Sequence, residues 1–186
     1  MTLELKKFDM RWITFKPNEN KGPVIVMIGR RDTGKSFLVR DLLYHHQDVP
    51  IGTVISGTEA GNGFYAKHVP KLFIHGEYNT NIIQNMLKRQ KLMLEKQQSG
   101  EQVDPRAFLI LDDCLYDNTW AKDKHMRSIF MNGRHYKLLF MLTMQYALGI
   151  PPNLRTNIDY VFILRENYVS NRKRLYEHYA GMFPTF

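Results

Sequence analysis

Short apolar runs alternate with amphipathic segments along this chain of 186 residues. Residues 23–28 are continuously apolar and are followed by glycine, which is typical of a strand buried on both faces of a parallel sheet. Over residues 80–98 apolar side chains recur at helical spacing. We predict strands at residues 23–28, 51–56, 72–75, 107–111, 137–144 and 160–164, helices at 36–47, 80–98, 122–132 and 170–179, and a glycine-rich loop at 57–63. This alternation indicates a three-layer α/β fold, with a mainly parallel central sheet and helices on both faces.

The loop after the first predicted strand matches the phosphate-binding pattern G-x-x-x-x-G-K-[ST] in full, from Gly29 to Ser36. A strand before it and a helix after it give the context that the pattern requires, which argues against a chance match. In such a loop the backbone N–H groups face the phosphates of the nucleotide. Lys35 is expected to neutralise the charge on the β- and γ-phosphates, and the Ser36 hydroxyl is expected to ligate Mg²⁺. We therefore predict that this P-loop binds ATP and Mg²⁺ through Gly29, Arg31, Asp32, Thr33, Gly34, Lys35, Ser36 and Phe37.

An acidic pair closes the most hydrophobic of the predicted strands, at residues 107–111. We expect Asp112 to hold Mg²⁺, directly or through water, as in other P-loop enzymes. Asp113 is placed to polarise the attacking water as a general base. The alternative for Asp113 is a helix N-cap or a loop acid. The pair favours a hydrolase, because kinases of small molecules need no such base.

A glutamine is the third candidate. In P-loop ATPases with a catalytic acid after this strand, the next strand is inserted between the P-loop strand and the acidic strand. Residues 137–144 would be that strand, which puts Gln145 at its carboxyl end, facing the γ-phosphate. There Gln145 can orient water or report the loss of the phosphate. The alternative is a polar residue that merely closes a strand.

Length and composition bound the remaining possibilities. The chain is globular in composition, and we expect one motor domain at residues 22–186 after an N-terminal extension at 1–21. The longest apolar runs are too short to span a bilayer, so no membrane insertion is expected. A single cysteine, Cys114, cannot form an internal disulfide and is expected to serve in packing. The net charge of +8 favours a polyanionic partner such as nucleic acid.

Further motifs make the chain similar to a viral family. It resembles the genome-packaging ATPases of nucleocytoplasmic large DNA viruses, which belong to the FtsK–HerA superfamily of P-loop ATPases. Besides the P-loop, the matching stretches are residues 109–114, 131–135, 142–146, 151–157, 164–167 and 180–183. The family usually shows more chain after the last of these, which predicts a C-terminally truncated form. A second departure is the Asp-Asp pair, where Asp-Glu is common elsewhere in the superfamily.

The resemblance implies a motor that translocates double-stranded DNA into a preformed capsid, without sequence preference. It implies a homo-oligomeric ring, a pentamer or hexamer, with capsid or portal components as partners. The expected location is the host cytoplasm or the viral factory, with association with the virion as a further expectation. Two other functions stay open: another DNA-handling P-loop ATPase, helicase-like or for segregation, and a small-molecule kinase or nucleotide switch.

Ring motors hydrolyse ATP at subunit junctions, where a neighbouring subunit supplies an arginine finger. By resemblance to the superfamily's spacing, Arg134 is the first candidate for this finger, and Arg155 is the second. Arg31 is expected to act within its own subunit, because related terminases carry an arginine four residues before the P-loop lysine. For each arginine the alternative is a surface or structural ion pair.

Two basic clusters could contact DNA phosphates, which would give affinity without sequence preference. The alternative for either cluster is a solvated helix face. The first cluster consists of Lys88, Arg89, Lys91 and Lys96, and the second of Arg172, Lys173 and Arg174.

Overall fold

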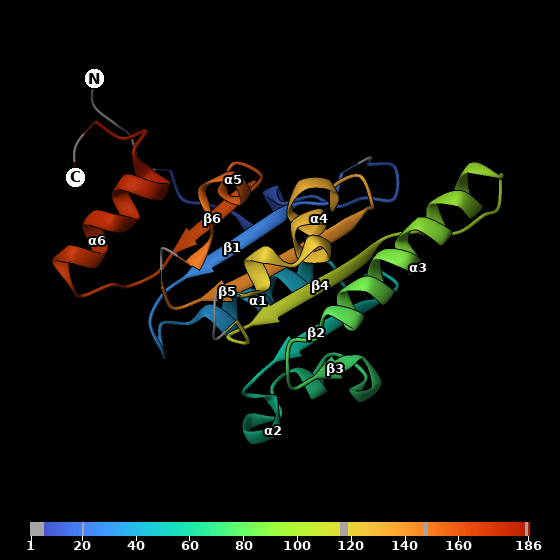
Figure 1. Ribbon diagram of the computed structural model, residues 1–186, viewed down its shortest axis with the longest axis horizontal. Helices are drawn as coiled ribbons and strands as arrows, with labels where there is room; N and C mark the ends of the chain where they lie inside the picture. The colour runs from blue at the N-terminus through green and yellow to red at the C-terminus, as the bar shows by residue number, and fades with distance from the viewer. Residues whose placement is uncertain (1–5, 20, 116–118, 147–148, 185) are drawn as a thin grey trace.

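A single parallel sheet forms the centre of the molecule. The computed structural model describes residues 6–19, 21–115, 119–146, 149–184 and 186 (Figure 1). In this part of the chain, six strands pair in the order β3-β2-β4-β5-β1-β6, and all pairs are parallel. The strands are β1 (Val24–Ile28), β2 (Gly52–Ser56), β3 (Ile74–His75), β4 (Ala107–Asp112), β5 (Leu138–Met144) and β6 (Tyr160–Ile163). The predicted insertion of β5 between β1 and β4 is confirmed.

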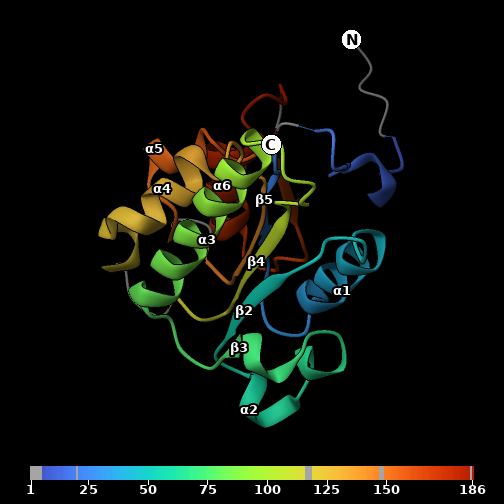
Figure 2. The same ribbon diagram turned by 90° about the vertical axis from the view of Figure 1, so that its right-hand side faces the viewer.

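Helices cover both faces of the sheet, as predicted. The α-helices are α1 (Lys35–His45), α2 (Glu59–Asn62), α3 (Thr80–Gln98), α4 (Lys124–Asn132), α5 (Pro152–Arg155) and α6 (Val169–Leu175). Shorter turns are η1 (Met10–Trp12), η2 (Tyr65–Lys67), η3 (Lys71–Phe73), η4 (Thr119–Lys122) and a π-helical turn, η6 (Tyr176–Ala180). Figure 2 shows α1 on one side of the sheet and α3 with α4 on the other. Among the described residues, no helix is both long and apolar enough to cross a membrane.

Several helix boundaries differ from the prediction: α1 spans Lys35–His45 where 36–47 was predicted, and α5 was not predicted. The loop predicted at 57–63 contains the one-turn helix α2, which ends at Gly63 in a left-handed conformation (φ 54°). The helix predicted from residue 122 starts at Lys124, because the Asp123 side chain accepts a hydrogen bond from the His125 N–H and caps that end. The basic helix predicted at 170–179 is α-helical in α6 and then continues as η6.

Two apolar clusters pack against the two faces of the sheet, and this explains why the strands are apolar throughout. On the face covered by α1, Ile25 and Ile110 are fully buried together with Val39 of α1. On the opposite face, Leu109 is fully buried with Ile83 of α3. Burying an aliphatic side chain of this size stabilises a fold by roughly 1.5–3 kcal/mol, so these clusters are the main source of stability.

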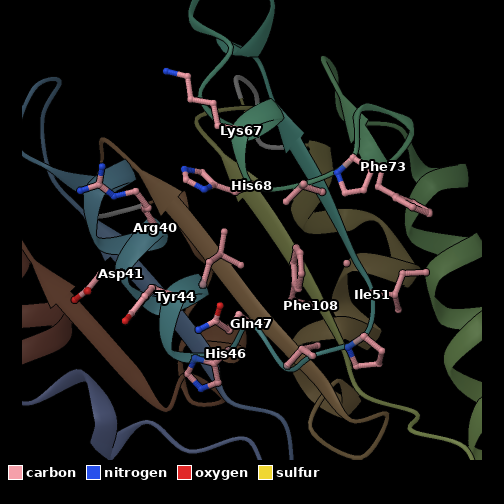
Figure 3. A pocket seen from close by; sticks show the side chains of 16 residues that line it. Arg40, Asp41, Tyr44, His46, Gln47, Ile51, Lys67, His68, Phe73 and Phe108 are labelled. Carbon is pink, nitrogen blue, oxygen red and sulfur yellow. The ribbon is translucent and has the colours of Figure 1, made fainter.

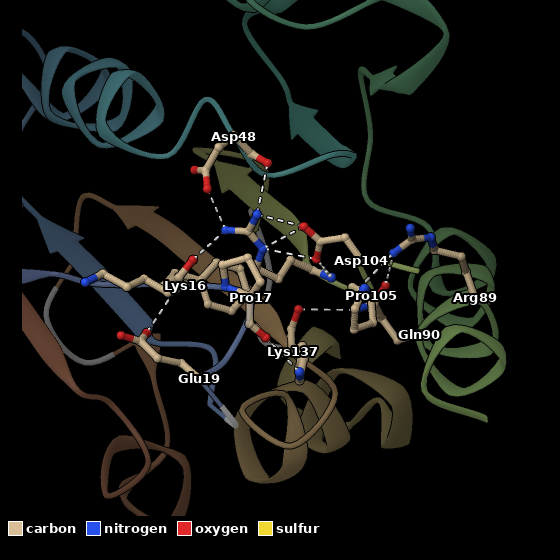
Figure 4. A network of polar contacts seen from close by, with 11 residues as sticks. Lys16, Pro17, Glu19, Asp48, Arg89, Gln90, Asp104, Pro105 and Lys137 are labelled. Atoms are coloured by element: carbon tan, nitrogen blue, oxygen red, sulfur yellow. Dashed lines mark hydrogen bonds and ion pairs between the residues drawn. The ribbon is translucent and has the colours of Figure 1, made fainter. Parts of the chain in front are cut away.

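A buried arginine ties the N-terminal segment to the amino edge of the sheet (Figure 4). The side chain of Arg106 is 3% exposed and donates hydrogen bonds to the Phe15 carbonyl (2.8 Å), to Asp48 (2.8 Å) and to Asp104 (2.7 Å). The Lys137 amine donates to the carbonyl of Pro17 (3.1 Å). Phe15 is also buried in the cluster on the α1 face. The segment predicted as an extension therefore contributes to the core; its residues 1–5 and 20 lie outside the described residues.

Candidate active site

The predicted site residues converge at the carboxyl edge of the sheet. Because the strands are parallel, the ends of β1, β4 and β5 lie side by side at this edge. The P-loop follows β1, the acidic pair closes β4, and Gln145 follows β5. The Gly29 N–H donates to the Met144 carbonyl (3.1 Å), which fixes the start of the loop beside the end of β5.

The P-loop has a backbone shape that only certain residues permit. Asp32 and Gly34 both have positive φ angles, 59° and 98°, so the chain curls tightly before α1. At Gly29, a Cβ atom would lie 2.7 Å from the Thr33 hydroxyl and 2.8 Å from the Leu164 Cβ, so a side chain does not fit there. Among the described residues, no side chain caps the start of α1. Its first N–H groups are therefore available to an anion, which the helix dipole also favours.

Lys35, Asp113 and Gln145 meet at one carboxylate oxygen. The Lys35 side chain is buried, and its amine donates to the carbonyls of Gly29 (2.9 Å) and Arg30 (3.1 Å). The same amine lies 3.6 Å from Asp113 Oδ2, which accepts a hydrogen bond from the Gln145 amide (3.2 Å). Asp113 has a left-handed backbone (φ 45°), which turns the chain at the end of β4. The structure thus brings together the lysine, the expected base and the glutamine.

Asp112 is bound by a threonine that the sequence analysis did not single out. The Thr143 hydroxyl donates to Asp112 Oδ1 (2.6 Å) and accepts from the Asp113 N–H (3.1 Å). Thr143 lies opposite Asp112 in the register of β4 and β5. The available signal was a hydroxyl side chain within the otherwise apolar run 138–144.

The environment of Asp112 fits a bound cation. Only 4% of Asp112 is exposed, and burial raises the pKa of its carboxyl group, although the Thr143 hydrogen bond acts in the opposite direction. A cation would relieve this cost of burying a negative charge. In the described residues, no group of three or more His, Cys, Asp or Glu could hold a metal ion. Mg²⁺ bound with a nucleotide needs only one or two carboxylates besides phosphate oxygens and waters, so Asp112 with Ser36, the second residue of α1, fits it.

A cavity of about 540 Å³ lies beside the P-loop. Arg31, Asp32 and Thr33 line it on one side, and the segment after β6 lines it on the other. In that segment, Glu166 accepts a hydrogen bond from the Tyr168 N–H (2.9 Å), which lowers the pKa of Glu166. Of the predicted nucleotide-binding residues, Arg31, Asp32 and Thr33 line this cavity, whereas Gly29, Gly34, Lys35, Ser36 and Phe37 do not.

Phe37 points elsewhere. Its ring is 61% exposed on α1 and lies 4.8 Å from the guanidinium carbon of Arg40. Arg40 also lines a larger cavity of about 620 Å³ between α1, the start of β2 and residues 67–73 (Figure 3). None of the residues predicted to bind ATP lines that cavity.

The two arginine-finger candidates lie in different places. Arg134 is at the amino edge of the sheet, where its carbonyl accepts from the Gly22 N–H (3.0 Å) and its guanidinium is 3.9 Å from Asp159. The length of β5 separates it from the P-loop of its own subunit, so it cannot act there. Arg155, in α5, lies over the Tyr179 ring (5.7 Å), and its Nη1 is buried without a hydrogen-bond partner in the described part of the chain.

The basic clusters and the cysteine have partly structural roles. Arg89 is half-buried and donates to the Pro105 carbonyl (3.2 Å), and Lys96 pairs with Glu101 (3.2 Å), whereas the remaining lysines of the first cluster are exposed. In the second cluster Arg174 donates to the Tyr146 hydroxyl (2.6 Å). Cys114 is 3% exposed, and burial raises the pKa of its thiol to about 12, as expected for a packing residue.

Comparison with known proteins places the chain among proteins of large DNA viruses. No family model matches it. It is 45% identical over 188 residues to the uncharacterized protein 075L of Invertebrate iridescent virus 6, covering 98% of the chain and 70% of that protein. The chain belongs to this viral protein family. A protein of Acanthamoeba polyphaga mimivirus is 44% identical over 187 residues, covering 98% of the chain and 64% of the relative, so the chain spans about two thirds of these relatives' length.

Solved structures with a similar fold include a viral genome packaging NTPase and a conjugation coupling protein, each in complex with a nucleotide analogue. The genome packaging NTPase B204 of Sulfolobus turreted icosahedral virus 2, in complex with AMPPCP, has a TM-score of 0.58 and 14% identity, covering 90% of this chain and 85% of that chain. The pCW3 conjugation coupling protein TcpA with ATPγS has a TM-score of 0.64 and 14% identity, covering 87% and 53%. The chain therefore shares its α/β fold, with a parallel central sheet and helices on both faces, with these proteins, as predicted.

Proposed function

We propose that this chain is an ATP-hydrolysing motor that moves double-stranded viral DNA into a preformed capsid. The observation that carries the proposal is the convergence of Lys35, Asp113 and Gln145 beside a P-loop and a buried Asp112. A kinase that transfers phosphate to a small molecule does not need this acid pair with a glutamine.

Each residue of the site has its own role in ATP hydrolysis. The free N–H groups at the start of α1 bind phosphate oxygens, and the Lys35 amine turns from the loop carbonyls to the β- and γ-phosphates. Ser36 and Asp112 would hold Mg²⁺, which would neutralise charge that develops on the phosphates. Once Lys35 has turned away, Asp113 Oδ2 is free to accept a proton from the attacking water. Gln145, already bonded to that oxygen, orients the water.

DNA translocation is supported by three observations. The relatives come from large DNA viruses, a fold neighbour is a genome packaging NTPase, and the net charge is +8. We further propose that the chain forms a homo-oligomeric ring, in which Arg134 or Arg155 reaches the active site of the neighbouring subunit. Its proposed partners are capsid or portal components, and its proposed location is the host cytoplasm or the viral factory. The similarity to a conjugation coupling protein keeps a different DNA-handling motor as the second candidate.

The test is steady-state ATP hydrolysis with and without long double-stranded DNA, over a range of protein concentrations. The proposal predicts activity that DNA stimulates, that rises more than linearly with concentration, and that Lys35→Ala and Asp113→Asn abolish. Activity that is linear in concentration and indifferent to DNA would instead identify a self-contained NTPase. A duplex-unwinding assay separates a helicase, because a packaging motor moves along the duplex without opening it.

The arginine candidates need a separate experiment. Arg134→Ala chains are mixed in increasing proportion with wild-type chains, and hydrolysis is measured. If Arg134 acts in the neighbouring subunit, mixed rings lose more activity than the proportion of variant chains. A loss in simple proportion would leave Arg155, tested in the same way, as the candidate.

A further inference from the structure

A buried tyrosine near the acidic pair has no role in the site described so far. Tyr65, in η2, is 1% exposed, and among the described residues its hydroxyl makes no hydrogen bond of standard length and angle. Buried polar groups in proteins are nearly always hydrogen-bonded, so an unpartnered hydroxyl in the interior calls for a reason.

The position of Tyr65 follows from the alternation of side chains along the strands. Successive side chains of β4 point to opposite faces, so Asp112 shares a face with Ile110, which packs in the cluster on the α1 side. Tyr65 packs in the same cluster. Ser36 is the second residue of α1, the helix that covers this face. The expected magnesium ligands and the Tyr65 hydroxyl therefore lie on one side of the sheet.

The hydroxyl and the carboxylate are close enough to affect each other. Burial raises the pKa of Tyr65, and the negative charge of Asp112 and a side-chain interaction with that carboxylate raise it further; the same interaction lowers the pKa of Asp112. The backbone around the tyrosine is fixed, because the Glu59 carboxylate accepts hydrogen bonds from the N–H groups of Tyr65 (2.9 Å) and Ala66 (2.8 Å). Thr143 already occupies Asp112 Oδ1.

We propose that Tyr65 is a positioning residue for magnesium, whose hydroxyl donates a hydrogen bond to the Asp112 carboxylate when the nucleotide and metal are bound. This rests on the proposed function. Thr143 and Tyr65 would then hold the carboxylate from two sides and fix its orientation toward the metal. Partners of this kind, behind a metal ligand, typically contribute a factor of about 10–100 to metal affinity.

The test measures how much magnesium strengthens nucleotide binding. A fluorescent ATP analogue is titrated with wild-type protein and with Tyr65→Phe, once with Mg²⁺ and once with EDTA. Phenylalanine keeps the ring and removes only the hydroxyl. We expect an unchanged Kd in EDTA and about a tenfold smaller gain in affinity from Mg²⁺ in Tyr65→Phe.

The matched control is Tyr78→Phe, on the other face of the sheet, where the hydroxyl donates to Asp123 (2.8 Å). It should leave the gain from Mg²⁺ unchanged. A second measurement repeats Tyr65→Phe in the Asp112→Asn background, where the tyrosine should have no effect on the gain.

The possible outcomes separate the two proposals. An equal gain from Mg²⁺ in wild type and Tyr65→Phe would overturn the role of Tyr65. So would a parallel loss of affinity in Mg²⁺ and in EDTA, which would show that the hydroxyl serves the fold. A Tyr65→Phe effect that persists in Asp112→Asn would also contradict it. If the wild-type protein binds no nucleotide under either condition, the proposed function itself fails.

Discussion

Thr143→Val should weaken the fold through the acidic pair, because one hydroxyl makes two hydrogen bonds there. The bond to the buried Asp112 carboxylate (2.6 Å) is charge-assisted, a kind that contributes roughly 1.5–3 kcal/mol, and the bond from the Asp113 N–H (3.1 Å) contributes about 0.5–1.5 kcal/mol. Valine adds one buried methyl group, which offsets about 0.8 kcal/mol. We expect the free energy of unfolding to fall by about 2–3 kcal/mol.

Urea denaturation measures this change, and thermal melting should show a drop of about 4–12 °C for a chain of this size. The control is Thr53→Val, a buried threonine of β2 whose side chain lies on the opposite face of the sheet from Asp112. A double-mutant cycle with Asp112→Asn then isolates the pair, and we expect a coupling energy of at least about 1 kcal/mol. If Thr143→Val costs no more than Thr53→Val, or costs the same in both backgrounds, the hydroxyl does not support the carboxylate as argued.

Three further changes test other parts of the structure. Gly29→Ala should weaken binding of a fluorescent ATP analogue at least about tenfold, because its Cβ clashes with two side chains, whereas Gly61→Ala, with open space around it, should not. Arg106→Leu should lower the free energy of unfolding by about 3 kcal/mol in urea, because it leaves acidic partners unpaired, while the surface change Lys96→Met should cost less than about 1 kcal/mol. Asp112→Asn should melt higher than wild type. Burial raises the pKa of Asp112. The contribution of this carboxyl group to the stability of the fold is therefore complete below its unfolded pKa of 3.8 and is lost as pH rises through its folded pKa. The difference in melting temperature between Asp112→Asn and wild type should grow as pH rises above 3.8, and it should become constant above the folded pKa of Asp112. A melting temperature of the variant no higher than that of wild type would contradict this reasoning.

The parts of the fold that could be predicted are those that depend on neighbouring residues. The P-loop is eight consecutive residues, and a strand and a helix on either side of it follow from local apolar patterns. The boundaries of α3 agree with the prediction at both ends, because Asn79 caps its start and the amphipathic pattern stops at Gln98. The insertion of β5 came from the known order of strands in this type of ATPase, and local pattern alone would not have given it.

The parts that could not be predicted depend on register and on contacts between distant segments. Thr143 reaches Asp112 only because β4 and β5 pair in one register, and a shift by one residue would turn its hydroxyl to the other face. Tyr65 lies near the same carboxylate, in a segment that the sequence marks only as following a glycine-rich loop. Arg106 finds partners at Phe15 and Asp48, which are far apart in sequence. None of these contacts has a spacing that a motif could encode.

The contacts of Lys35 hold the site in its present shape. With Asp112 and Asp113 side by side, the end of β4 concentrates negative charge, and the Lys35 amine lies 3.6 Å from one of these carboxylates while donating to two loop carbonyls. On the proposed function, ATP would draw the amine away from these partners, each of which contributes on the order of 1 kcal/mol. Mg²⁺ bound with the nucleotide would supply positive charge near Asp112 where the lysine leaves Asp113. Binding at this P-loop would therefore exchange one cation for another beside the acidic pair.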